Sequence, residues 1–585
     1  MLSKSELCYD TASKKEYLLV SRNSYSSSSI AGNTRKYHGL LVKNGYVLLS
    51  TVDEFVEGER ISCSRYKNAI VDEGLEKMYA YIHPARFLYW VSGIVEKRII
   101  LEDGGVRIIY KAKPKKKFKL IPLIAMRNVH SVRKDFEDVS VSVFENGFTA
   151  HSNNLKLKLE VSCDDSVQID RVDYTYYNVF YDRECKRGYE CCENLYAPVK
   201  IEAYTDSIEL LAYTERITKK FTQYHFTTPE RVLELACDSF IVGDWIVAGY
   251  HWFNEPWGRD AFVSLPGLLL ERGLFGRARR VFLYFVRRMK NGIIPNRVLG
   301  KPSYNSSDSS LWFIYALDRY MRKTNDTEFF YRLRAYIESI LEEYPNSEVA
   351  RLKGSMISVA PQTTWMDTRF TPRNGKAIEI NALWINALAF ADRYSITTTI
   401  DWRDALKEFK KIFWNGSYFN DLDGDNSLRP NQVIALAVLT SIPELKEDEE
   451  LYKELYDMAR KSCCVVEKEL LTPYGLRTLS PSHPDYIGRY MGDVSYHNGC
   501  VWPWLTGFYF ELKRNVGMEV SKSELIPVLS HIYDAGIGYI SEIFDGDAPH
   551  EPNGCIAQAW SVAEVYRALK IADQTTKITK IPKSN

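Results

Sequence analysis

The sequence lacks an excess of charge of either sign. Its 585 residues include 76 basic and 75 acidic side chains, which leaves a formal net charge of +1. Without a positive field to attract phosphate groups, neither a nucleic-acid partner nor an anionic membrane surface is expected. A neutral ligand fits this balance better.

Long hydrophobic runs are also missing. No segment approaches the ~18 uninterrupted apolar residues that suggest a membrane-spanning helix. The first residues, MLSKSELCYD, are charged and lack the apolar core of a signal peptide. The sequence therefore predicts no membrane partner and a cytoplasmic location.

Cysteines are present, but not at metal-binding spacing. The eleven cysteines are scattered, and Cys191-Cys192 and Cys463-Cys464 are adjacent doublets instead of CxxC pairs. A complete DxDxDG calcium frame and a glycine-rich phosphate loop are absent as well. We expect reduced, mostly buried thiols, no metal and no cofactor.

The residues that are present divide the chain into two parts. Up to about residue 215, segments such as RIILEDGGVRIIYKAK and FKLIPLIAM alternate apolar and polar residues between Gly, Asn and Asp turns. This pattern is typical of antiparallel strands. It predicts a β-sandwich-like domain over residues 1–215, followed by a linker over 216–228.

The second part has the 3.6-residue apolar period of helices. Twelve antiparallel helices suggest six hairpins closed into an (α/α)6 toroid over residues 229–575, with a polar tail over 576–585, so the fold class is α+β multidomain. In a toroid, the loops at one end converge on a central funnel, where chemistry is expected. The expected helices are 229–243, 260–272, 275–290, 308–322, 326–345, 379–395, 401–414, 429–441, 450–468, 498–514, 521–538 and 556–571.

A basic segment, NTRKYHGLLV, lies in the β-rich half. Its polar residues from Arg35 to His38 precede Gly39 and an apolar strand. Two interpretations are equally supported. The segment is either a basic loop leading into a strand, or a surface that faces the second domain or a substrate.

Asp367 ends the segment TTWMD, in the loop before the sixth expected helix. A carboxyl group beside aromatic and thioether side chains has a raised pKa and can donate a proton at neutral pH. Asp367 is therefore a candidate general acid. A role as N-cap or turn residue is the alternative, although no helix follows immediately.

Glu542 lies in the loop before the twelfth expected helix, directly after the apolar stretch AGIGYIS. We expect it to project into the funnel and act as general base, although an acidic loop is more often a solvated surface or a weak calcium site. Two carboxylates on facing loops suit glycoside hydrolysis. Inversion follows if they are ~6.5 to 9.5 Å apart.

The stretch EPWGRDAFVSLPGLLL places Arg259 and Asp260 at the start of a helix, with Trp257 beside them. An aromatic ring next to a guanidinium and a carboxylate suits a sugar, whose apolar face stacks while its hydroxyls are hydrogen-bonded. An Asp N-cap with an exposed Arg is the simpler alternative for this tripeptide alone.

Further polar and aromatic segments are expected at the same end of the toroid, and eleven of the twelve tryptophans follow position 240. A structural role for His497 is as well supported as a ligand contact. The candidates for positioning hydroxyls and stacking sugar rings are Asn305, Asp308, His497, Asn498, Trp502 and Trp504.

These motifs together resemble the glycogen debranching enzyme family, in its amylo-α-1,6-glucosidase part, over nearly the whole chain and in the family's order. The segments that carry the resemblance are NTRKYHGLLV, WGRDAFVSLPGL, TWMD, TPRNGKAIEINALW, YHNGCVWPW, SEIFDGD and GCIAQAWSVAEVYRAL.

The resemblance implies inverting hydrolysis of α-1,6-linked glucose at branch points of glycogen or a branched maltodextrin. By motif position the acid is Asp367 and the base Glu542, while Arg259, Asp260 and Glu379 resemble the residues that grip the terminal glucose. Pro256 and Ala261 depart from the family's usual pattern around the WGRD run, and the separate barrel domain of the two-activity eukaryotic enzymes is not seen in this sequence. Additional substrate contacts are assigned to Trp312, Trp365, Gln558 and Trp560.

Two other functions remain open. One is another exo-acting α-glucosidase on the same toroid, of the glucoamylase or trehalase type. The other is a non-catalytic glycogen-binding protein, although burying two carboxylates without using them carries a desolvation cost. The sequence predicts no oligomeric state.

Overall fold

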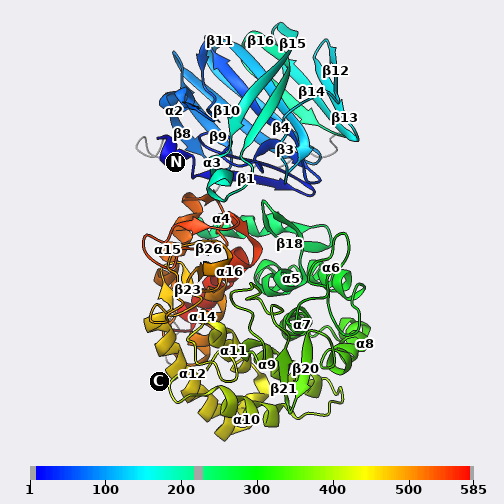
Figure 1. The fold of residues 1–585 in the computed structure, drawn as a ribbon, viewed down its shortest axis with the longest axis vertical. Coiled ribbons are helices and arrows are strands. Elements are labelled where there is room, and N and C mark those ends of the chain that lie inside the picture. Colours follow the sequence, from blue (N-terminus) through cyan, green and yellow to red (C-terminus); the bar gives the residue numbers. More distant parts are fainter. Residues whose placement is uncertain (1–7, 216–227, 580–585) are drawn as a thin grey trace. The chain divides into compact units, whose positions relative to one another are not determined.

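A computed structural model describes residues 8–215 and 228–579, and side chains as far as residue 575. The chain divides into two compact units (Figure 1). The first contains the described residues before 216 together with 532–538, and the second contains 228–531 and the described residues from 539 onward. The expected linker, apart from its last residue, and most of the expected polar tail lie outside the described residues.

The first unit is built of antiparallel strands, as the alternating pattern predicts. The long strands β11 (Gly105–Asn128) and β16 (Cys192–Tyr213) pair with each other, and β11 also pairs with β4 (Tyr46–Val56) and β10 (Ile94–Glu102). The other main strands are β1 (Glu16–Ser21), β2 (Ser24–Ser29), β3 (Gly39–Lys43), β8 (Met78–Ile82), β9 (Arg86–Trp90), β12 (Val139–Phe144), β13 (Gly147–Ser152), β14 (Leu155–Cys163) and β15 (Val167–Phe180).

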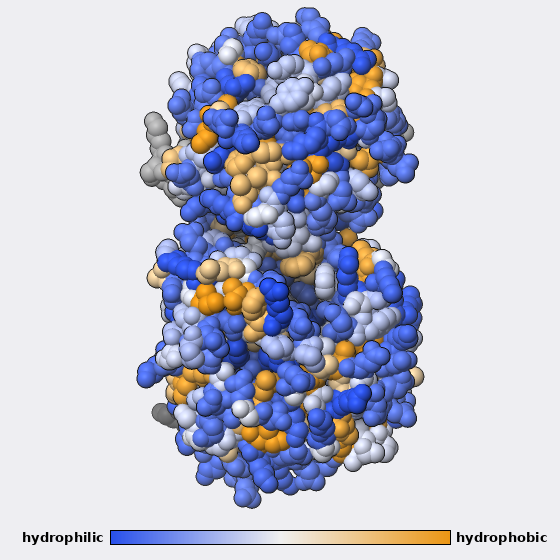
Figure 2. All heavy atoms as spheres, viewed as in Figure 1, coloured by the Kyte–Doolittle hydropathy of each residue, from blue (hydrophilic) through white to orange (hydrophobic). Residues whose placement is uncertain are grey.

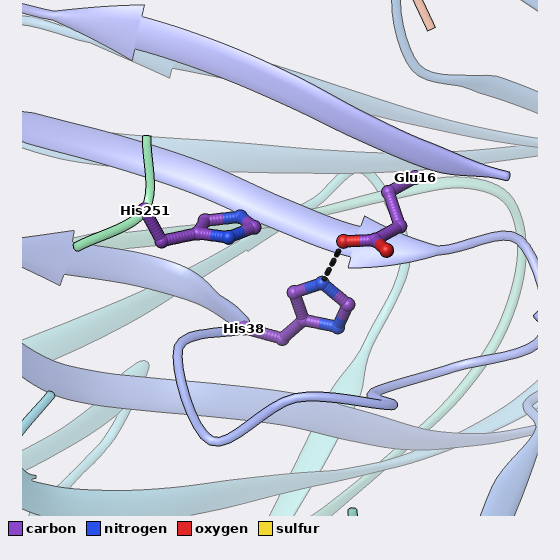
Figure 3. Close-up of side chains that lie close together, drawn as sticks. All are labelled: Glu16, His38 and His251. Atoms are coloured by element: carbon purple, nitrogen blue, oxygen red, sulfur yellow. Dashed lines mark hydrogen bonds and ion pairs between the residues drawn. The ribbon is translucent and has the colours of Figure 1, made fainter. Parts of the chain in front are cut away.

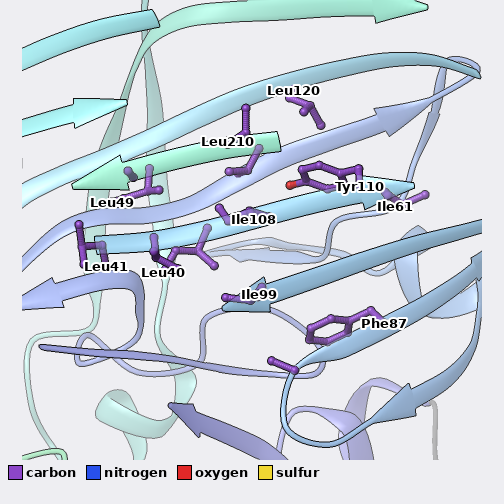
Figure 4. Packing of buried hydrophobic residues seen from close by; sticks show 14 of the residues in the cluster. Leu40, Leu41, Leu49, Ile61, Phe87, Ile99, Ile108, Tyr110, Leu120 and Leu210 are labelled. Atoms are coloured by element: carbon purple, nitrogen blue, oxygen red, sulfur yellow. The ribbon is translucent and has the colours of Figure 1, made fainter. Parts of the chain in front are cut away.

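The inward side chains of these strands form one core (Figure 4). Ile99, Ile108 and Leu210 come from β10, β11 and β16, and each is at most 2% exposed. Burying an aliphatic side chain of this size stabilises a fold by about 1.5–3 kcal/mol. The β-sandwich-like architecture is confirmed.

The basic segment before β3 turns inward within its own unit. Arg35 donates through Nε to both carboxylate oxygens of Glu16, at 3.1 and 2.9 Å. His38 accepts the Thr34 amide at Nδ1, so Nε2 carries the proton and donates to Glu16 at 2.9 Å (Figure 3). Burial opposes ionisation of Glu16, but Arg35 and His38 outweigh it and lower its pKa well below the usual range. These contacts match a basic loop leading into a strand.

The prediction of a helix over 521–538 is wrong for the second half of that range. The helical turns are η5 (Lys522–Leu525), α15 (Ile526–Ser530) and η6 (His531–Tyr533), and they are followed by the strand β25 (Gly536–Ile537). β25 pairs in parallel with β1 and belongs to the first unit. Gly538 at φ +92° allows the chain to turn after β25, and such glycines do not continue a helix.

Six helices of the second unit form a closed inner ring. Each packs on the next, and α16 packs on α5, which completes the circle. Side chains of α11 are buried along its whole length, as expected for a helix enclosed on all sides. The ring consists of α5 (Gly258–Leu265), α7 (Ser309–Thr324), α9 (Ile378–Arg393), α11 (Asn431–Leu439), α14 (Leu505–Asn515) and α16 (Ala559–Thr579).

Outer helices alternate with the inner ones along the chain. They bury one face only, as α10 does with Ala405, Leu406 and Phe409. The toroid is therefore confirmed, and the segments that precede the inner helices gather at one end of the ring. The outer helices are α4 (Pro229–Ala236), α6 (Phe275–Val286), α8 (Thr327–Glu343), α10 (Trp402–Phe413), α12 (Glu449–Glu469) and α15.

Two more expected helices lose seven residues at one end, and α16 continues past its expected end at residue 571 to Thr579, inside the expected polar tail. The helix expected over 229–243 ends at Ala236, and a 3-10 turn and the strand β17 (Ile241–Val242) follow it. The helix expected over 498–514 begins at Leu505, because residues before it form the strand β24 (Val501–Trp502), which pairs with β23 (Gly475–Arg477). In both cases sheet pairing replaces helical hydrogen bonds at the end of the helix.

No helix in the described part of the chain is both long and apolar enough to cross a membrane. On the face drawn in Figure 2, hydrophilic residues cover most of each unit, and hydrophobic residues appear in small separate groups.

Candidate active site

Contacts around the ring bring together the N-terminal ends of the inner helices. Arg259, in the first turn of α5, binds Asp308, which directly precedes α7. Trp504, which precedes α14, stacks on Trp560 in the first turn of α16, with ring centroids 5.3 Å apart. Asp367 accepts a hydrogen bond from Arg259, and Glu542 lies close enough to Asp260 for its charge to affect the pKa of Asp260, so both groups lie at this end of the toroid.

Arg259 holds Asp367. Its Nη1 donates to Oδ2 of Asp367 at 3.0 Å, and its Nε donates to the two oxygens of Asp308 at 2.9 and 2.7 Å. Its Nη2 donates to the carbonyl oxygens of Thr363 and Thr364 at 3.3 and 2.8 Å. The guanidinium therefore directs its hydrogen bonds to the protein, and it fixes the Asp367 carboxyl on its loop between β21 (Met356–Val359) and α9.

The surroundings of Asp367 match the apolar setting expected from its sequence. Trp365 and Met366 are buried, whereas 43% of the Asp367 side chain is exposed. Removal of water by the surrounding protein raises the pKa of Asp367, and although Arg259 opposes this, the net pKa is raised. An accessible carboxyl with a raised pKa can deliver a proton.

Glu542 is oriented by two donors. The Tyr496 hydroxyl donates to its Oε1 at 2.5 Å, and the backbone amide of Cys555 donates to its Oε2 at 2.9 Å. The side chain is only 2% exposed. Gly554 makes room for it, because a Cβ at that position would lie 2.3 Å from Oε2. Glu542 precedes the strand β26 (Ile543–Phe544), which fixes its backbone.

Asp260 lies next to Arg259 in the first turn of α5 and is 8% exposed. Burial raises the pKa of Asp260 to about 7, Arg259 opposes the change, and the nearby charge of Glu542 adds to it. The Gln558 amide donates to Asp260 Oδ1 at 3.3 Å. The consecutive residues Arg259 and Asp260 thus interact with the two candidate catalytic residues: Arg259 binds Asp367, and the charge of Glu542 raises the pKa of Asp260.

Glu379 lies in a buried ionic network with Arg373 and Asp421. Arg373 binds it through both terminal nitrogens, and the same guanidinium donates from Nε to Asp421 at 2.8 Å. Burial raises the pKa of Glu379, and Arg373 opposes the shift without cancelling it. The Asn431 amide joins the network at Asp421, at 2.7 Å. Glu379 therefore supports the loop that carries Asp367.

The expected sugar-stacking tryptophans are largely core residues. Trp312, Trp365, Trp502, Trp504 and Trp560 are each at most 5% exposed, and they pack on one another. The indole of Trp365 donates to Asn431 Oδ1 at 2.7 Å, and that of Trp502 donates to the carbonyl of Tyr496 at 3.0 Å. Trp257 is only partly buried.

Several buried polar atoms of this end of the ring have no hydrogen-bond partner among the residues that the structure describes. Buried polar atoms are nearly always paired, so such a group of atoms indicates a ligand or water. Burial and three nearby arginines lower the pKa of His497 well below its usual range, which keeps the ring neutral. The atoms are Nε2 of His497, Oε1 of Gln558 and Nε1 of Trp257, Trp504 and Trp560.

The remaining predicted contact residues have protein partners. Asn498 accepts from Arg429 at 2.9 Å and donates to the Val494 carbonyl at 3.1 Å. Asn305 is exposed, and its Oδ1 accepts from Ser303 at 2.7 Å. Around the candidate carboxylates, no three described His, Cys, Asp or Glu side chains gather closely enough to hold a metal ion.

Sequence reasoning did not single out Tyr496 and Arg373. Both lie in motifs that the sequence analysis quotes, Tyr496 in YHNGCVWPW and Arg373 in TPRNGKAIEI. What could have pointed to them is that a buried carboxylate needs a hydrogen-bond donor. Tyr496 is that donor for Glu542, and Arg373 is that donor for Glu379. Sequence spacing alone does not reveal which donor reaches which carboxylate.

Comparison with known proteins relates the chain to carbohydrate enzymes. Residues 15–209 match the family model "Glycogen debranching enzyme N terminal", and residues 233–567 match "Amylo-alpha-1,6-glucosidase". The glycogen debranching enzyme of Saccharomyces cerevisiae is 25% identical over 448 residues, covering 52% of this chain and 28% of the yeast protein. This chain thus matches less than a third of the yeast protein's length.

Among solved structures, a bacterial glucoamylase complexed with acarbose is similar in fold. It is 13% identical, the TM-score is 0.57, and the match covers 97% of this chain and 93% of that one. Since the amylo-alpha-1,6-glucosidase model spans more than half of the chain and the N-terminal model most of the first unit, this chain belongs to the glycogen debranching enzyme family.

Proposed function

We propose that the chain is a glycoside hydrolase that releases glucose from α-1,6 branch points of glycogen or limit-dextrin-like glucans, with inversion at the anomeric carbon. The observation that carries this proposal is the pair of carboxyl groups on separate loops, each held by its own donors. Asp367 is held by Arg259, and Glu542 by Tyr496 and the Cys555 amide. Inverting hydrolysis needs one acid and one base with room for water between them.

Asp367 acts as the general acid. Arg259 occupies Oδ2, which leaves Oδ1 to carry the proton to the departing glycosidic oxygen. Since burial raises the pKa of Asp367, the carboxyl keeps its proton to a higher pH than an ordinary aspartic acid does. Activity is therefore expected to fall as the pH rises through that pKa.

Glu542 acts as the general base. The Tyr496 hydroxyl and the Cys555 amide hold its two oxygens in place, so the carboxylate is ready to take a proton from a water molecule. This water attacks the anomeric carbon from the face opposite the departing oxygen. The product of an α-linked substrate is then β-glucose.

The terminal glucose is gripped by the unpaired polar atoms at the ends of the inner helices. His497 Nε2, Gln558 Oε1 and the indole nitrogens of Trp504 and Trp560 supply donors and acceptors for sugar hydroxyls. Arg259 acts as a positioning residue for Asp367. Glu379 acts indirectly, by holding Arg373 in the loop that carries Asp367.

A glucoamylase-type or trehalase-type specificity is the second candidate, favoured by the fold shared with a bacterial glucoamylase. Incubation with panose, glucosyl-branched dextrin, maltotriose and trehalose, while free glucose is followed, separates the candidates. Faster release from the two α-1,6-linked substrates supports debranching. Faster release from maltotriose or trehalose overturns the proposed preference for α-1,6 linkages. No glucose release from any of the four substrates favours a glycogen-binding protein.

We also propose that the enzyme works on glycogen or branched maltodextrin in the cytoplasm. All eleven cysteines are free thiols, as expected in a reducing compartment.

A further inference from the structure

A second charged site lies along the inner ring, away from the candidate active site. A cavity of about 160 Å³ opens between α7, α14, α16 and the turn after α5. Arg514 lies nine residues beyond the first residue of α14, and Arg319 ten residues beyond that of α7. At 1.5 Å per residue these positions are roughly 14–15 Å from the ends that carry Asp308 and Trp504.

Cations outnumber anions in the wall of this cavity. Lys323 is paired with Glu271 at 3.1 Å, which neutralises one cation. Glu564, behind the wall, binds Arg567, and burial raises the pKa of Glu564 to about 7, which weakens it as a counter-charge. The charged lining consists of Arg319, Lys323, Arg514, Arg567 and Lys570 against Glu271 and Glu511.

Glu511 at the centre is already saturated. Arg319 and Arg567 each approach one of its oxygens at 2.6 Å. Burial opposes ionisation of Glu511, but the arginines outweigh it and lower its pKa strongly. A third guanidinium gains little from the same carboxylate.

That third guanidinium belongs to Arg514. Its hydrogen bonds to Glu511 and Asn515 are both 3.5 Å long, at the limit for such bonds. The side chain is 38% exposed, and burial together with the neighbouring Arg319 and Arg567 lowers its pKa. Beside it, Lys570 faces the ring of Tyr566 at 4.8 Å. Arg514 and Lys570 are therefore two cations at a cavity without enough carboxylate to balance them.

We propose that this cavity binds a small phosphate-type oxyanion, with Arg514 as its main contact and Lys570 beside it. A guanidinium presents two parallel N–H groups to a phosphate, and an ammonium adds a point charge. A cavity of about 160 Å³ has room for a phosphate group. The ligand is either free phosphate or the phosphate group of a phosphorylated sugar.

Isothermal titration of the full chain with sodium phosphate tests the site, with ionic strength held constant by sodium chloride. A second titration with glucose 1-phosphate distinguishes the two sources. We expect saturable binding. Arg514→Gln should weaken it at least about tenfold, because a hydrogen bond between charged groups is lost, and Lys570→Gln should weaken it less. Arg332→Gln is the matched control, since Arg332 is exposed on the outer helix α8.

Saturable binding of either anion that depends on Arg514 supports the site. Tighter binding of phosphate identifies free phosphate as the source, and tighter binding of glucose 1-phosphate identifies a phosphorylated sugar. Absence of saturable binding overturns the proposal, and so does binding that Arg514→Gln leaves unchanged, because the anion then lies elsewhere. The rate of glucose release from panose provides the folding check, since Arg514 and Lys570 lie outside the proposed catalytic machinery.

Discussion

Both units bury charged residues, and the two clusters differ in how completely the charges are balanced. In the β unit, Glu16 meets Arg35 and His38 together, and its pKa is lowered. In the helical unit, the pKa values of Asp260 and Asp367 are raised, because burial outweighs the single guanidinium of Arg259. A buried carboxylate whose charge is balanced by cationic and hydrogen-bonding partners stabilises a fold. A buried carboxyl group with too few such partners has a raised pKa and can exchange a proton.

The largest expected effect is the loss of activity when either of the proposed catalytic carboxyl groups is removed. Asp367→Asn and Glu542→Gln should each reduce glucose release by at least about 100-fold, the scale of general acid–base catalysis, with unfolding unchanged. Asp547→Asn is the control, because Asp547 is exposed in the loop that follows Glu542 and should not matter. Near-normal turnover of either variant would remove that residue from the mechanism.

The next effect is a pH dependence of stability that Asp260 imposes. Its folded-state pKa is about 7 against an ordinary value of 3.8. Between these values folding takes up a proton, so this contribution to stability is full below about pH 4 and is lost as the pH rises to about 7. The loss reaches about 4 kcal/mol.

Asp260→Asn tests this sign. The variant should gain stability relative to the natural protein as the pH is raised from 4 to 8, measured by urea unfolding of the helical unit. A difference that stays constant with pH, or shrinks, would show that Asp260 is not held in its protonated form.

The cluster of Glu16, Arg35 and His38 in the β unit should change stability with pH in the direction opposite to that of Asp260. Glu16→Gln leaves Arg35 without its buried counter-charge and should cost about 3 kcal/mol near neutral pH. Because the pKa of Glu16 is lowered, its contribution is present above the ordinary carboxyl pKa and is lost as the pH falls. Urea unfolding of the β unit at pH 7 and pH 3 measures both effects.

Glu190→Gln is the matched control for that variant, since Glu190 is 63% exposed and pairs with Lys134 only at 3.7 Å. Equal stability of the two variants would mean that the Glu16 cluster adds no more than a surface ion pair.

The smallest effect concerns the hydroxyl group that orients Glu542, the proposed base. Tyr496→Phe removes the hydroxyl bound to Glu542 Oε1 and should lower kcat about tenfold, with KM changing less. Tyr486→Phe, which loses a hydroxyl bound to the exposed Asp547, should leave kcat unchanged. An unaltered kcat for Tyr496→Phe would show that the Cys555 amide orients Glu542 without help.

Much of the fold follows from local patterns. Alternation predicts the strands of the β unit, and the 3.6-residue period predicts the inner ring, because both patterns record which face is buried. Residues 536–537 depart from this rule, since β25 is defined by its pairing with β1, more than 500 residues away. Local sequence carries no signal for such a partner.

The sequence predicts candidate catalytic residues, but it does not predict which side chains hold them in place. The positions of Asp367 and Glu542 follow from the loops that precede inner helices. The partners of Arg259 do not, because Asp308 and Asp367 meet it only when the ring closes. The tryptophans show a similar limit, since the sequence reveals where aromatic rings accumulate but not that five of the tryptophans at this end of the ring pack on one another in the core.

The most direct test of the account is proton NMR of the first glucose released from panose, recorded before mutarotation. With Asp367 as acid and Glu542 as base acting on water, the α-1,6 linkage should yield β-glucose first, followed by slow formation of the α anomer. Initial release of α-glucose would contradict the inverting mechanism and the role of Glu542 as base.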